Sequence, residues 1–128
     1  MKLYLSKGEV LISGDVLDLQ NIRACIEKIK DNDMLTFTFL TDANPAPYDF
    51  LERNLIVRAT SGPANASFIE GEGVIVEGSK ANLDIFASYF DFDVGTAPGC
   101  HYHWDEACGA DCVAAGTLPI VVAVAGNT

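Results

Sequence analysis

The sequence predicts an α+β fold, in which two tandem ββαββ units form a pseudo-twofold domain with two helices packed on one face of a largely antiparallel sheet. Three observations predict it. Short apolar runs come in pairs joined by glycine-bearing turns, two stretches have apolar residues at helical spacing, and both patterns recur after 64 residues. The length of 128 residues suits one domain with one core. We therefore expect a single domain made of a first unit, 1–64, and a second unit, 65–128.

The repeat becomes visible when the chain is shifted by 64 residues. Residues 10–12 (VLI) then align with 74–76 (VIV), and Gly14 aligns with Gly78. The shift is half the chain length, which indicates a duplicated unit. A unit of this size is too small to be comfortably stable alone. We expect the two units to share a core about a pseudo-twofold axis, as a homodimer would.

Each unit begins with a hairpin, because a glycine-bearing turn between two apolar runs is typical of one. The predicted hairpin strands are Lys2–Ser6 with Val10–Ser13, and Ala66–Glu70 with Val74–Glu77.

A helix follows each hairpin. Asp15 and Ser79 are good N-caps, because their side-chain oxygens can accept hydrogen bonds from the free amides of the first turn. The apolar stripes that should face the core are Leu19, Ile22, Ile26 and Ile29 in the first helix, and Leu83, Phe86, Ala87 and Phe90 in the second.

Two more strands complete each unit. They are predicted at Met34–Leu40 and Leu55–Thr60 in the first unit, and at Cys100–Trp104 and Ile120–Ala125 in the second. The intervening segment Thr41–Arg53 contains the sequence NPAP, which predicts irregular backbone there.

The charge excludes some partners and allows others. The net charge of −10 argues against nucleic acid and anionic membranes. It allows a basic protein partner, and the alternative is that the charge only keeps the protein soluble. The charge is uneven: residues 1–64 carry seven basic and nine acidic residues, whereas 65–128 carry only Lys80 against nine acidic residues. We expect the second half to present an acidic surface.

No apolar run reaches the roughly 18 residues of a membrane span, and MKLYLSKGEV does not resemble a signal peptide, so we expect a cytoplasmic protein.

The most distinctive stretch is GCHYHWDEACGADC, residues 99–112, which holds both histidines and three of the four cysteines. Its spacing, H-x-H-x4-C-x3-C, allows a zinc site made of His101, His103, Cys108 and Cys112. Asp105 and Glu106 are alternative oxygen ligands. The competing interpretation is a half-buried strand whose histidines hydrogen-bond to neighbours and whose cysteines act as small apolar residues.

The repeat leaves the orientation of this strand open. At a strict shift of 64, His101 and His103 take the places of Phe37 and Phe39 and face the core. If one residue is gained or lost after the second helix, the faces exchange, and Tyr102 and Trp104 become core residues instead.

The same stretch contains the ingredients of a thiol-dependent enzyme, with Cys100, Cys108 or Cys112 as nucleophile and a histidine as base. No cysteine-hydrolase signature surrounds them, and acidic neighbours raise a thiol pKa. The chain also lacks a phosphate loop, G-x-G-x-x-G and H-E-x-x-H. We expect a non-enzymatic protein and assign no catalytic residue.

The second half resembles small immunity proteins of bacterial polymorphic-toxin systems. The likeness lies in Val74–Gly78, Leu83–Phe90, Gly99–Asp105 and Leu118–Ala125. The first half departs from the pattern, since Phe37 and Phe39 stand where the histidines would be. The resemblance implies an inhibitor that binds a cognate toxin, but it transfers no specific contact residue. The acidic second half makes Trp104, Asp105, Glu106 and Asp111 the candidate partner-binding residues, and the sequence leaves open whether the protein is a monomer or a homodimer.

Overall fold

The computed structural model describes residues 1–125; residues 126–128, which complete the predicted second unit, lie outside the described residues. The elements follow one another along the chain as β1 (Lys2–Ser6), β2 (Glu9–Gly14), α1 (Val16–Glu27), β3 (Met34–Thr38), β4 (Phe50–Glu52), β5 (Asn54–Ala59), β6 (Asn65–Ile69), β7 (Gly73–Gly78), α2 (Lys80–Ser88), β8 (His101–Trp104), the short 3₁₀ helix η1 (Glu106–Cys108) and β9 (Ile120–Val124). The predicted α+β class with two helices is therefore confirmed. Strand β4 and helix η1 were not predicted.

The strands form two sheets, where the sequence predicted one. The five-stranded sheet has the order β4-β1-β2-β9-β8, and the four-stranded sheet has the order β3-β5-β7-β6. Most neighbouring strands are antiparallel, as predicted, but each sheet also contains one parallel pair, β2 with β9 and β5 with β7.

The parallel pairs exchange strands between the two halves of the chain. The hairpin β1–β2 pairs with β9, so that Val10 lies opposite Ile120. The hairpin β6–β7 pairs with β5, so that Val74 lies opposite Leu55. Each sheet therefore combines the hairpin of one half with the two strands β8 and β9, or β3 and β5, that follow the helix of the other half, and β4 adds a further first-half strand to the five-stranded sheet. Neither half contains a complete sheet of its own.

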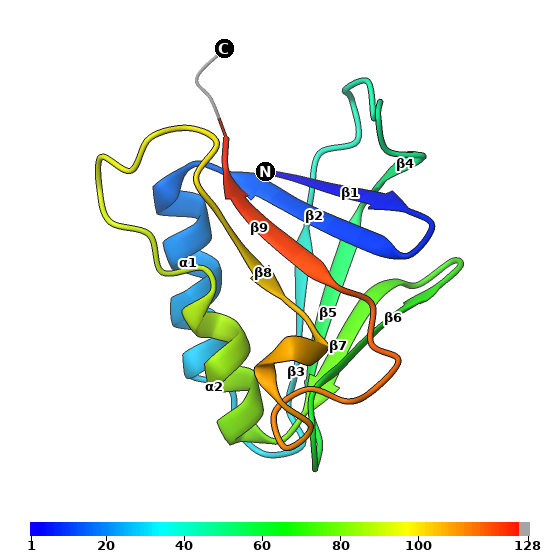
Figure 1. The fold of residues 1–128 in the computed structure, drawn as a ribbon, viewed down its shortest axis with the longest axis vertical. Helices are drawn as coiled ribbons and strands as arrows, with labels where there is room; N and C mark the ends of the chain where they lie inside the picture. The colour runs from blue at the N-terminus through cyan, green and yellow to red at the C-terminus, as the bar shows by residue number, and fades with distance from the viewer. Residues whose placement is uncertain (126–128) are drawn as a thin grey trace.

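Both helices begin at the predicted caps. The Asp15 side chain accepts a hydrogen bond from the backbone amide of Asp18 at 2.8 Å, and Ser79 does the same for Asn82 at 3.2 Å. The two helices lie side by side on one flank of the molecule, and the strands occupy the other (Figure 1).

One continuous core joins the two sheets and the two helices. Burial of these side chains is the main force that holds the fold together. Its members alternate along the strands and follow the predicted stripes on the helices; they include Leu3, Leu5, Val10, Ile12, Leu19, Ile22, Ile26, Leu55, Val57, Val74, Val76, Leu83, Phe86, Ile120 and Val122.

Candidate functional site

The distinctive stretch 99–112 forms the edge strand β8 and the turn of η1 that follows it. Within β8, only Trp104 is buried; it is 0% exposed. Its ring meets Phe86 of α2 edge-on, with ring centroids 4.9 Å apart. Trp104 therefore has no surface with which to contact a partner, and the prediction that it is a partner-binding residue is wrong.

The two histidines lie on the opposite face of β8. His101 is paired with Ala123 and His103 with Val121 of β9, and both histidines are exposed. Their rings lie side by side, with centroids 5.0 Å apart, and His101 Nδ1 is 2.9 Å from the carbonyl oxygen of Gly99. The histidines thus face solvent, as in the second of the two predicted registers.

The orientation follows from the length of the connection after α2. From the first residue of α1 to that of β3 the chain advances from 16 to 34, whereas from α2 to β8 it advances from 80 to 101. The second half is therefore longer by three residues at this point. An odd number of extra residues exchanges the two faces of a strand. As a result, Trp104 lies opposite Ile120 in the way that Phe37 lies opposite Leu55.

The cysteines of the predicted zinc site lie apart from the histidines. The Cys108 thiol contacts the hydroxyl of Tyr89 at 2.7 Å, and Cys108 and Cys112 both pack against the core. Tyr89 in turn meets Tyr102, which alternation places on the face of β8 away from the histidines. Within residues 1–125, no three His, Cys, Asp or Glu side chains are grouped so that they could hold one metal ion. Of the four predicted ligands, the two histidines lie together, and within the described residues they form no group of three with either cysteine.

The Tyr89 hydroxyl has an unusual environment. Its hydrogen bond with Cys108, its partial burial and the nearby charge of Asp105 raise the pKa of Tyr89 to about 12.

A thiol-dependent enzyme would need a base within hydrogen-bond reach of the cysteine that acts as nucleophile. Among the hydrogen bonds of residues 1–125, none joins a cysteine to a histidine.

The acidic groups predicted to bind a partner lie around this turn. Asp105 caps η1, accepting a hydrogen bond from the Ala107 amide at 2.9 Å, and Glu106 accepts one from the Gly116 amide at 2.8 Å. Asp111 is exposed in the following loop, where its carbonyl oxygen accepts a hydrogen bond from Asn82. Local hydrogen bonds therefore hold the backbone of the acidic loop while its carboxylates reach solvent.

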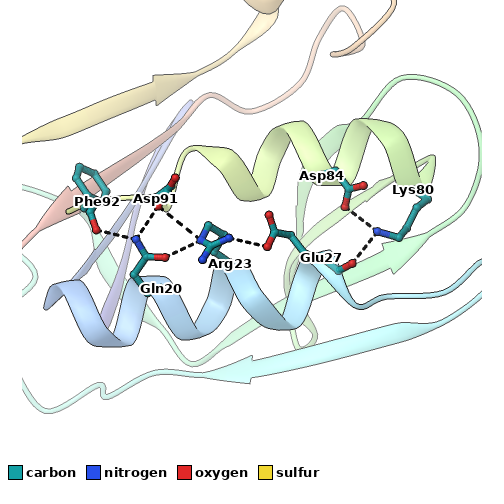
Figure 2. A network of polar contacts seen from close by, with 7 residues as sticks. All are labelled: Gln20, Arg23, Glu27, Lys80, Asp84, Asp91 and Phe92. Carbon is teal, nitrogen blue, oxygen red and sulfur yellow. Dashed lines mark hydrogen bonds and ion pairs between the residues drawn. The ribbon is translucent and has the colours of Figure 1, made fainter. Parts of the chain in front are cut away.

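Two cations, Arg23 and Lys80, lie along the contact between the two helices and bind acidic groups there (Figure 2). Arg23 of α1 pairs with Glu27 at 2.6 Å and with Asp91 at 3.7 Å. Lys80, the only basic residue of the second half, pairs with Asp84 at 2.7 Å and donates to the Glu27 carbonyl.

The remaining acidic groups of the second half stay unpaired. In the part of the chain that the structure describes, six second-half carboxylates lie outside every ion pair: Glu70, Glu72, Asp93, Asp105, Glu106 and Asp111. The second half therefore presents uncompensated negative charge, three groups of which lie in and beside η1.

Next to this charge lies a feature that the sequence analysis missed. A surface hollow of about 360 Å³ between α2 and β8 is lined by Ile85, Ser88, Tyr89 and Tyr102, and we call it the aromatic hollow. Ile85 and Tyr102 are 36% and 47% exposed, and Tyr102 stacks on Phe92. The signal for it was the break in the apolar stripe of the second helix, where Ile85 falls outside the core face.

Comparison of the chain with protein-family models, with curated proteins and with solved structures finds no match. Neither helix within residues 1–125 has both the length and the apolar character that crossing a bilayer requires.

Proposed function

We propose that this chain is a non-enzymatic binding protein that attaches to a basic surface of another protein in the cytoplasm through its acidic second half. The observation that carries the proposal is the charge balance of the second half, where nine carboxylates stand against one lysine, Lys80, which is itself paired with Asp84. Uncompensated charge of one sign accelerates encounter with a surface of the opposite sign and rejects partners of the same sign.

The resemblance to small immunity proteins of bacterial toxin systems gives the partner a class. On that reading the partner is a basic toxin domain, and binding blocks its action. A loop with a fixed backbone suits this role. The carboxylates of Asp105 and Glu106 accept hydrogen bonds from backbone amides, and the backbone carbonyl of Asp111 accepts one from Asn82. Preorganised contacts lose less entropy when a complex forms.

The test is to look for a neighbouring gene that encodes a basic toxin domain and to measure by calorimetry whether that domain binds this protein. We expect the combined change Asp105→Asn, Glu106→Gln and Asp111→Asn to weaken binding by about tenfold and to flatten its salt dependence, since each rim charge contributes up to about 1 kcal/mol. Asparagine and glutamine keep the acceptor oxygens that hold the loop. A matched control, Glu9→Gln with Asp31→Asn and Asp42→Asn, removes the same charge from the first half. Equal effects of the two triple variants would refute the acidic second half as the binding surface.

A second candidate function is the binding of a divalent metal ion by the histidine pair. The observation in its favour is the 5.0 Å separation of two exposed imidazoles on one strand face. Imidazole nitrogens are good ligands for zinc, copper and nickel, and water or another protein would complete the coordination. Calorimetry with Zn²⁺ tests it: His103→Ala should abolish binding, whereas Cys108→Ser and Cys112→Ser should leave it intact. Loss of binding in the cysteine variants would instead support the four-ligand site.

A further inference from the structure

The aromatic hollow combines three features that favour a positive charge. First, two tyrosine rings form its walls, Tyr89 and Tyr102, which meet edge-to-face with centroids 6.4 Å apart. Aromatic rings attract cations through their negative faces. Second, Ser88 is the last residue of α2, so the hollow lies at the negative end of a helix dipole.

The third feature is the charge around it. The last turn of α2 contains no basic residue. Asp105 is close enough to the Tyr89 hydroxyl to help raise its pKa, and Asp93, which lies outside every described ion pair, follows Phe92, whose ring stacks on Tyr102. Arg23 of α1 pairs with Glu27, and Lys80 of α2 pairs with Asp84; both cations lie along the contact between the two helices (Figure 2). Ile85 adds apolar surface against which an alkyl chain can pack.

We infer that the aromatic hollow receives an arginine side chain of the protein partner. The inference rests on the proposed function and adds the residue type that the site selects. Arginine fits better than lysine, because its planar guanidinium stacks on aromatic rings, loses less hydration energy and also pairs with carboxylates. A volume of about 360 Å³ lies at the small end of ligand sites, which suits one side chain and not a large ligand.

Two charge-matched probes separate this inference from general attraction to an acidic protein. They are fluorescein-labelled peptides of the same length, one alternating arginine with serine and the other lysine with serine, and their binding is followed by fluorescence anisotropy. We expect the arginine peptide to bind about fivefold more tightly than the lysine peptide, because guanidinium stacks on aromatic rings with its planar face and is less strongly hydrated than ammonium.

Two substitutions should remove this preference. Tyr102→Ala deletes one wall of the hollow. Ser88→Lys places a cation in it at a position where a helix tolerates one, so folding is preserved. Tyr4→Ala, at a half-buried tyrosine on β1, is the control and should leave the preference unchanged. Circular dichroism spectra check that each variant is folded.

The outcomes separate the two proposals. Equal affinity of the wild-type protein for the two peptides, with both weakened by neutralising Asp105, Glu106 and Asp111, would overturn the arginine site and leave the acidic binding surface standing. An arginine preference that survives both Tyr102→Ala and Ser88→Lys would overturn the hollow as its source. If neither peptide binds, the proposed basic partner and the arginine site are both overturned.

Discussion

Replacing Trp104 measures how much of the core depends on the orientation of β8. Its side chain is fully buried against Phe86. Removing a buried tryptophan to alanine costs about 3–5 kcal/mol, because packing is lost and a cavity remains. For a chain of 128 residues, 4 kcal/mol corresponds to a fall in Tm of about 15 °C. His103 lies on the exposed face of the same strand, so His103→Ala should change the free energy of unfolding by no more than about 0.5 kcal/mol.

Urea unfolding followed by far-UV circular dichroism is the suitable assay, since Trp104 is the only tryptophan and its fluorescence disappears in the variant. Trp104→Phe is a milder second variant in case Trp104→Ala does not fold. Within the described residues, the indole Nε1 has no hydrogen-bond partner. Phenylalanine therefore removes an unpaired buried N–H as well as some packing, and should cost less than alanine. A larger loss of stability for His103→Ala than for Trp104→Phe would refute the assigned orientation of β8.

Three further predictions concern the caps, a glycine and the Tyr89–Cys108 contact. Asp15→Ala and Ser79→Ala should each lower the free energy of unfolding by about 1 kcal/mol, because each removes an N-cap; asparagine at position 15 should restore most of it. If either change lowered the free energy of unfolding by less than Asn21→Ala, a control in the middle of α1, the cap assignment would be contradicted. Gly78→Ala should cost about 1–3 kcal/mol more than Gly14→Ala, since the new Cβ would lie 2.7 Å from the Ala64 backbone in one case and from the flexible Met1 side chain in the other. Ultraviolet titration should give Tyr89 a pKa of about 12, and Cys108→Ala should lower this pKa. Because the pKa of Tyr89 in the folded protein lies above the unfolded value of 10.0, the protonated hydroxyl stabilises the folded state. This contribution to the free energy of unfolding is complete below pH 10 and is lost as the pH rises through about 12. An unchanged pKa in Cys108→Ala would show that the thiol is not its main cause.

Local signals in the sequence were sufficient for both helices and for every strand except β4. The turn at Lys7-Gly8, the caps at Asp15 and Ser79, and the apolar stripes of both helices depend on residues close together in the chain, and the structure contains all of them. Strand β4 was missed because its three residues follow a proline-rich segment and gain their pairing from β1, a distant strand. Pairing between distant strands leaves little trace in a single sequence.

The candidate site shows the same limit. The orientation of His101 and His103 depends on three extra residues in a connection, and the repeat alone allowed both orientations. Trp104 was named as a partner-binding residue although one of the two predicted orientations placed it in the core, and its burial depends on Phe86, which lies on another element. The aromatic hollow was missed because it joins α2 to β8, which are separated by residues 89–100.

The exchange of strands between the halves has a consequence for synthesis on the ribosome. Strand β9 is the last strand within residues 1–125, and it lies inside the five-stranded sheet between β2 and β8. The four-stranded sheet needs only residues up to Gly78 and can assemble while the chain is still growing. The hairpin β1–β2, although made first, has to wait for Val124 to leave the exit tunnel before its exposed edge is covered. During that interval, the first strands of the protein are the ones most in need of a chaperone.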